Sequence, residues 1–169
     1  MTPGDVAVVR LARWLAEAPL ELAALARHHG DLATYAAALS ADPSNGPLCA
    51  AVAVALHAYY TALESLFDRT ARHVDGAPPD TRDWHRELLM QMAADLMPLR
   101  PRLVPAALLE SIDALRRFRH FFRHAYAVRL EAQHLLQHAA TVTACHVELR
   151  AALDAGVAHV QALRDGAVG

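Results

Sequence analysis

The chain has 169 residues and a mass of 18.4 kDa, and 54% of its residues are hydrophobic while only 6% are aromatic. A chain of this length fits one domain, and its apolar residues are mostly Ala, Leu and Val, of which Ala and Leu are strong helix formers. The formal net charge of −2 argues against a protein that coats nucleic acid over its whole surface. We therefore expect a single all-α domain.

The cysteines and the apolar runs indicate the compartment. Cys49 and Cys145 lie too far apart in sequence for a local metal knuckle and imply no disulfide framework, so we expect both to be reduced and partly buried. Arg10 and Arg13 interrupt the first apolar run, which argues against a signal peptide. The longest apolar stretch, residues 48–56, is about half of the roughly 18 residues that a membrane span needs. We expect a cytoplasmic protein with no membrane partner.

The N-terminal quarter of the chain predicts two helical pieces. Residues 5–29 have a helical pattern with a break at Pro19, and a shorter helix is expected after a helix end at Gly30. The sequence DPSNGP at 42–47 is the clearest loop in the chain. Residues 1–45 are therefore predicted to form an N-terminal helical extension.

The remaining residues, 46–169, predict an up-and-down four-helix bundle. Apolar side chains recur every three or four positions in four stretches, and short loops between long helices favour antiparallel neighbours. The third stretch holds DWHRELLMQM, the loop MPLRPRLVP with Arg100 and Arg102 follows it, and Gly156 weakens the last helix. The four predicted helices span about 48–74, from 81 or 83 to about 97, from 106 through 122, and 131–164.

An unusual group of ionisable residues stands in the octet RHFFRHAY at 119–126. It belongs to the strongly basic segment 100–130, in which seven Arg and two acidic residues give a net charge of +5. Arg neutralises and orients a phosphate, and His moves a proton near neutral pH. The octet has no carboxylate that would attract Mg²⁺, so it favours metal-independent phosphodiester cleavage by a ribose 2′-OH. Such helical turns are also common on solvated or interface faces, and composition alone leaves the function open.

A helical wheel separates the two central residues of the octet. If the helix is regular, Arg119 falls about 40° from Leu115, inside the apolar arc, and His124 falls about 140° from Arg119. A buried guanidinium needs a carboxylate, carbonyls or a bound anion, and Glu64 is a candidate partner. To act on one substrate, Arg119 and His124 need a break in the helix or a second copy of the helix across a dimer axis.

The string Arg119-x4-His124-x-Tyr126 matches the R-x4-H-x-Y motif of the HEPN superfamily, and the chain resembles a HepT-type toxin of the MNT/HEPN toxin–antitoxin systems. Three further segments, ALHAYYTALESLFDRTARHVDG, DWHRELLMQM and RFRHFFRHAYAVRLE, resemble a HepT-like branch in order and spacing. The resemblance covers about residues 46–165, and residues 1–45 have no counterpart in it.

The resemblance implies a type VII-like toxin, a metal-independent endoribonuclease that needs no cofactor and completes its active site by homodimerisation. Arg119 and His124 would be its catalytic pair, and its substrate would be tRNA or mRNA. The resemblance also implies that an MNT-type nucleotidyltransferase antitoxin transfers AMP to Tyr126. A nucleotide there would add bulk and negative charge where the RNA phosphate must lie.

Three further side chains are predicted from their charge to contact RNA phosphate: Arg116, His120 and Arg123. The modest net charge of the chain suggests short-range rather than generic RNA binding. A competing interpretation from the same family is a HEPN subunit that does not cut RNA and instead binds substrate for, or regulates, a nucleotidyltransferase.

Histidine spacing suggests a third interpretation, a metal-binding bundle. His120/His124 and His134/His138 are both i, i+4 pairs, a spacing that places two imidazoles on one helical face. Neither pair has an obvious third ligand in the sequence, and an exposed polar face better explains His134/His138.

Other histidines have simpler expected positions. His28, His29 and His146 are predicted to lie at the surface. His85 is ambiguous, because beside Trp84 it can cap or pack, yet it also resembles a family position that could lie near the site.

Overall fold

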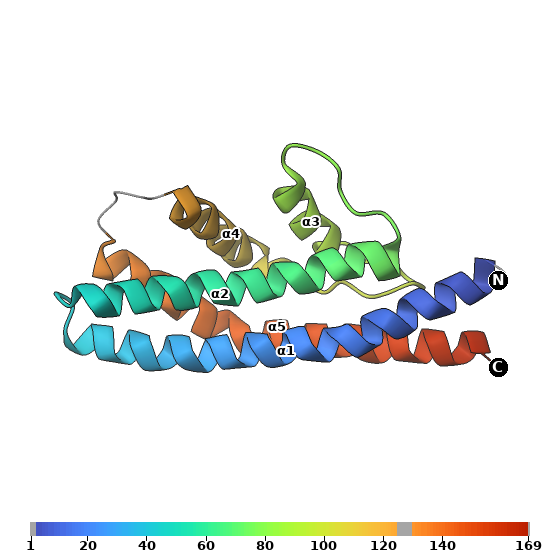
Figure 1. Ribbon diagram of the computed structural model, residues 1–169, viewed down its shortest axis with the longest axis horizontal. Helices are drawn as coiled ribbons and strands as arrows, with labels where there is room; N and C mark the ends of the chain where they lie inside the picture. Colours follow the sequence, from blue (N-terminus) through green and yellow to red (C-terminus); the bar gives the residue numbers. More distant parts are fainter. Residues whose placement is uncertain (1–2, 125–129, 169) are drawn as a thin grey trace.

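The computed structural model describes residues 3–124 and 130–168, and the side chains of 4–122 and 130–166. Three long helices, α1 (Pro3–Ala41), α2 (Gly46–Thr70) and α5 (Ala132–Val168), lie side by side. Two shorter helices, α3 (Trp84–Ala93) and α4 (Leu109–His124), cover one side of α2 (Figure 1). The described residues form helices and no strand, so the predicted all-α bundle is confirmed.

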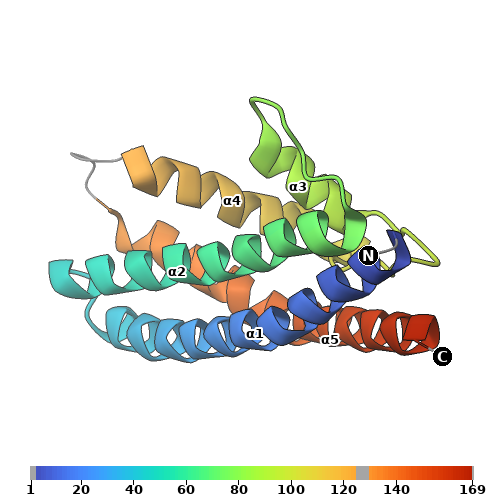
Figure 2. The same cartoon turned by 45° about the vertical axis from the view of Figure 1, so that its right-hand side comes forward.

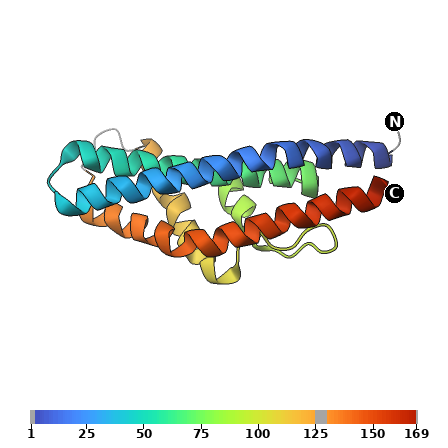
Figure 3. The same ribbon diagram turned by 90° about the horizontal axis from the view of Figure 1, so that it is seen from below.

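The chain turns back on itself so that both of its ends lie together. The short turn after α1 makes α2 antiparallel to it, and α5 also runs antiparallel to α1 (Figures 1 and 2). The two termini therefore lie at one end of the bundle, while the carboxyl end of α4 points toward the other (Figure 1). Seen from below, α1 and α5 lie next to each other along most of their length (Figure 3).

The predicted break at Pro19 and the predicted second helix after Gly30 are wrong, because α1 is one continuous helix. Pro19 is on the exposed side, where solvent can take the place of the lost backbone hydrogen bond, and Gly30 has open space around it. An apolar stripe on the opposite side continues past both residues and joins the same core as α2 and α5. The stripe consists of Leu11, Trp14, Ala18, Leu22, Leu25, Leu32 and Leu39.

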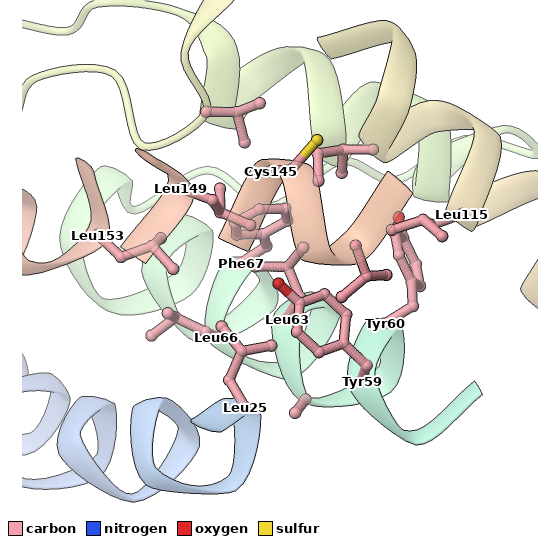
Figure 4. Packing of buried hydrophobic residues seen from close by; sticks show 14 of the residues in the cluster. Leu25, Tyr59, Tyr60, Leu63, Leu66, Phe67, Leu115, Cys145, Leu149 and Leu153 are labelled. Atoms are coloured by element: carbon pink, nitrogen blue, oxygen red, sulfur yellow. The ribbon is translucent and has the colours of Figure 1, made fainter. Parts of the chain in front are cut away.

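Helix α2 lies at the centre of the core and buries more than one face. Tyr59, Leu63 and Phe67 project between the other helices, toward Leu25 of α1 and Leu149 of α5 (Figure 4). By length and composition alone, the stretch Gly46–Asp75 could span a membrane, a test that core helices also meet, and half of its most apolar window is buried in the bundle.

The predicted extent of α2 is confirmed, and both of its ends have a clear local cause. The Asn45 side chain accepts a hydrogen bond from the Leu48 N–H at 3.0 Å, which caps the first turn. The last turn widens into a π-helical turn at Ala71–Asp75. Gly76 ends it with φ of 72°, a left-handed conformation that glycine adopts without strain.

The segment between α3 and α4 is anchored by a buried arginine. Helix α3 ends at Ala93, short of the predicted end at about residue 97, and a 3₁₀ turn, Ala106–Leu108, precedes α4. Between them Arg100 is 0% exposed, and its Nε and Nη2 each lie 2.7 Å from an Asp75 carboxylate oxygen. One of the seven arginines in the basic segment is thus a core residue of the fold.

Candidate functional site

Helix α4 carries the first six residues of the octet 119–126. Its apolar face packs over α2 and α5 through Ile112, Leu115 and Phe118. The site is built outward from that face. Tyr126, the predicted modification site, lies outside the described residues, and so do the side chains of Arg123 and His124.

The side chain of Arg119 turns toward α2 and is only 13% exposed. Its Nη2 lies 2.8 Å from Oε2 of Glu64, and its Nε donates to Oγ1 of Thr61 at 3.4 Å, a long hydrogen bond. The prediction that Arg119 lies in the apolar arc is confirmed, and so is Glu64 as its partner. A guanidinium cannot shed its charge, and this carboxylate neutralises it where water is scarce.

Glu64 is shared between two helices. Its side chain is 7% exposed, Oε2 contacts Arg119 of α4, and Oε1 forms a short hydrogen bond with Nδ1 of His85 on α3. A buried carboxylate is stable only when its oxygens are hydrogen-bonded or paired with charge, and here each oxygen has its own partner. Glu64 therefore joins α2, α3 and α4 at one point.

His85 is half-buried and held on two sides. Its ring stacks on Trp84 with 3.7 Å between centroids, while Nδ1 faces Glu64, and 24% of its side chain is exposed. His85 therefore packs on its neighbour, as expected, and it also contacts Glu64, the partner of Arg119. The sequence carried a usable signal in Glu64, a carboxylate three or four positions from the buried Tyr60 and Phe67.

The phenol of Tyr60 completes the buried side of the site. Burial raises the pKa of Tyr60, and the nearby carboxylates of Glu64 and Asp113 raise it further, against a smaller lowering by the guanidiniums of Arg116 and Arg119. Tyr60 is 1% exposed, so it is a neutral packing residue and presents no face to a substrate.

The predicted phosphate contacts lie in different environments. Arg116 is 16% exposed, and its Nε donates to Oδ1 of Asp113 at 2.7 Å. Arg117 contacts the other oxygen of the same carboxylate. His120 is exposed on the outer side of α4. The structure therefore brings Arg119, Glu64 and His85 together, and it holds Arg116 in an ion pair.

A pocket of about 480 Å³ opens between α4 and the start of α5. Phe118 and Phe121 line one side of it, and His134 and His138 line another. Burial lowers the pKa of His138, and the neighbouring His134 lowers it further. Among the described residues, no three His, Cys, Asp or Glu side chains are grouped to hold a metal ion, so the interpretation of the His134/His138 pair as a metal site gains no third ligand from them.

The predicted surface position of His29 and His146 is wrong. Their rings stack with 3.8 Å between centroids where α1 meets α5, and both are half-buried. The hydroxyl of Tyr59 and Nδ1 of His146 lie 3.1 Å apart in a hydrogen bond. Both histidines lie on the sides of long helices that pack together, which the sequence pattern of either helix alone does not show.

Comparison with known proteins identifies the family. The family model described as HepT-like protein matches residues 51–160, which contain Glu64, His85 and the whole octet. No curated protein and no solved structure matches the chain. The matched region covers most of the chain and includes α3, α4 and nearly all of α2. The chain therefore belongs to the HepT-like family of the HEPN superfamily.

Proposed function

We propose that this protein is a metal-independent endoribonuclease toxin of a type VII-like toxin–antitoxin pair that acts on tRNA or mRNA in the cytoplasm. The observation that carries the proposal is the environment of Arg119. Glu64 holds the arginine in place, and 13% of its side chain stays open to solvent within the R-x4-H-x-Y motif. A fixed, partly open guanidinium suits a phosphate, because its planar donors match phosphate oxygens.

The proposed reaction is attack by the ribose 2′-OH on the adjacent phosphate. The 2′-oxygen–phosphorus bond forms, the bond from phosphorus to the 5′-oxygen breaks, and the products are a 2′,3′-cyclic phosphate and a 5′-hydroxyl. Arg119 binds the charge on the non-bridging oxygens, and His124 exchanges a proton with the reacting groups. The chemistry of these residues requires no metal or cofactor.

A second copy of the chain is part of the proposal. Arg119 is directed toward α2, and α4 is helical up to His124, so a straight wheel keeps the two residues on different sides of one helix. A two-fold axis beside α4 brings the exposed face of α4 against that of its partner, and we propose that His124 of one protomer there reaches the solvent-open edge of the partner's Arg119. His120 on the exposed side and Arg123 would then contact neighbouring phosphates.

Regulation by AMP transfer to Tyr126 completes the proposal. Tyr126 follows α4 by two residues, so a nucleotide attached to it would be close to the motif in sequence and would carry negative charge into the phosphate site. The agent would be an MNT-type nucleotidyltransferase antitoxin. Tyr126→Phe should take up no AMP by intact mass and should keep most of the cleavage activity, and an AMP mass shift in that variant would contradict the assignment.

The deciding experiment uses unmodified protein, confirmed by intact mass, with labelled tRNA and mRNA in the presence of EDTA. Cleavage should leave 2′,3′-cyclic phosphate ends, and His124→Ala should lose on the order of 10²–10⁴ in rate, the usual value of a proton-transfer group. His73→Ala, in the π-helical turn away from the octet, is the matched control. Lack of cleavage by AMP-free protein would instead favour the HEPN subunit that binds or regulates without cutting.

A further inference from the structure

The proposed reaction needs two proton transfers. One group must take the proton of the attacking 2′-OH, and another must give a proton to the departing 5′-oxygen. The motif in α4 supplies one histidine with an assigned role, His124. The structure places a different histidine, His85, on the same carboxylate that holds Arg119.

The geometry of His85 is that of a histidine prepared to accept a proton. Nδ1 of His85 is hydrogen-bonded to Oε1 of Glu64. Because a carboxylate only accepts hydrogen bonds, we assign the proton to Nδ1, which leaves the lone pair of the neutral ring on Nε2. Stacking on Trp84 fixes the plane of the ring, and 24% of the side chain reaches solvent. A carboxylate that orients a histidine in this way is the arrangement by which enzymes position a general base.

A second histidine near a carboxylate, His134, lacks this fixed orientation. Nδ1 of His134 lies 3.7 Å from Oε2 of Glu131, and both side chains are 68% exposed. This pair is beyond good hydrogen-bonding distance and is surrounded by water, so it does not orient the ring. Burial of the carboxylate separates the two cases, since the side chain of Glu64 is only 7% exposed.

We propose that His85, oriented by Glu64, is the general base that takes the 2′-OH proton, and that it acts in the same protomer as Arg119. The 2′-OH proton passes to Nε2 of His85 as the bond from the 2′-oxygen to phosphorus forms. His124 gives a proton to the 5′-oxygen as its bond to phosphorus breaks, and solvent restores both histidines to their starting states. The inference rests on the proposed ribonuclease function and assigns the acid and the base separately.

The charged groups around His85 favour this role. Glu64 of α2 stabilises a protonated ring directly, whereas Arg119 of α4 opposes it from the far side of the same carboxylate. Arg116 and Asp113 of α4 form an ion pair with each other. The fifth group, Tyr60 of α2, stays neutral because burial raises the pKa of its phenol.

The test compares kcat/KM for RNA cleavage across pH in four proteins: the wild type, His85→Asn, His124→Ala and His134→Asn. Asparagine keeps a donor where Nδ1 of His85 stands, so Glu64 and Arg119 stay held while the basic nitrogen is lost. The wild type should give a bell-shaped profile. His85→Asn should lose on the order of 10²–10⁴ in rate together with the acidic limb, because that limb reports protonation of the base.

The other variants separate the roles of the histidines. His134→Asn should keep the wild-type profile, and His124→Ala should lose the basic limb. A fifth protein, His85→Ala, should be partly restored by added imidazole. A thermal melt of each variant checks folding. Cleavage by His85→Asn at the wild-type rate with both limbs intact would overturn the role of His85 and leave the ribonuclease standing. A wild type that cleaves no RNA would overturn both proposals.

Discussion

Two arginines of the basic segment are buried against carboxylates, and they differ in what their donors do. Arg100 is 0% exposed, and it donates two hydrogen bonds to Asp75 and three to the backbone carbonyls of Gln91, Ala94 and Pro101. Arg119 is 13% exposed and makes one close contact with Glu64 and one long hydrogen bond with Thr61. The first guanidinium is saturated by the fold, whereas the described residues supply the second with two partners only.

The number of arginines in a segment does not give the number of cations that are open to a ligand. A guanidinium has five N–H donors. A guanidinium whose donors are all used inside the protein stabilises the fold and has none left for a ligand. A guanidinium that is held by one carboxylate and still reaches solvent has a fixed position from which it can bind an anion. Net charge does not separate these cases, so the charge of +5 in residues 100–130 overstates what RNA would meet.

Arg100→Ala should have the largest effect on stability. It would leave Asp75, whose side chain is 3% exposed, without its countercharge, and breaking a buried pair from one side costs about 3–5 kcal/mol. Urea denaturation followed by circular dichroism measures the loss. Removing both partners in Arg100→Met/Asp75→Leu should cost less, and a loss below about 1 kcal/mol for Arg100→Ala alone would contradict the saturated pair.

Arg119→Ala should affect activity more than stability. Loss of a fixed charge at the phosphate should lower RNA cleavage on the order of 10²–10³-fold. The stability loss should be smaller than for Arg100→Ala. Glu64 keeps His85 as a hydrogen-bond partner, and the side chain of His85 is itself partly exposed to solvent. Arg119→Lys tests the fork, since lysine keeps the charge and loses the planar donors. Equal stability losses in Arg100→Ala and Arg119→Ala would contradict the distinction between the two arginines.

The stacked histidines provide a third, uncharged way of burying a polar group. Burial lowers the pKa of His146, and the nearby His29 and Arg150 lower it further, so the folded protein keeps the ring neutral. Below the ordinary histidine pKa of about 6.5, His146 binds a proton in the unfolded chain more readily than in the folded chain. The free energy of unfolding therefore falls as the pH falls. Urea titrations between pH 7.5 and 5.5 should show that fall, and His146→Asn should reduce its slope. An unchanged slope would place the titrating group elsewhere.

Removing an exposed ion pair should have the smallest effect on the free energy of unfolding. Nε of Arg72 lies 2.8 Å from Asp68 one helical turn away, and the two side chains are 55% and 32% exposed. Water screens such pairs, so Arg72→Ala should change the free energy of unfolding by at most about 0.5 kcal/mol. A larger loss would mean that ion pairs in this bundle cannot be ranked by burial.

Local pattern predicted the helical content, the course of α2 and the partner of Arg119. Each of these depends on the spacing of residues within one helix, or on comparing the helical wheels of two helices. The wheel placed Arg119 among apolar positions, and Glu64 is the acidic residue at a buried position of α2.

Tertiary contacts decided what the pattern could not. The continuity of α1 through Pro19 depends on the long stripe that it buries against α2 and α5. Asp75 precedes α3 in the chain and Arg100 follows it, so their pairing depends on how the chain folds around α3. The position of His85 depends on the packing of α3 beside Glu64, which the sequence pattern of α3 alone does not show.

The common location of the two chain ends has a practical consequence. Both termini emerge at one end of the bundle, and the carboxyl end of α4 points toward the opposite end (Figure 1). An affinity tag, a fluorescent protein or a surface tether fused at either terminus would therefore stand away from the motif. Immobilised protein should still present that end to RNA or to a modifying enzyme, which makes the chain well suited to surface-based binding measurements.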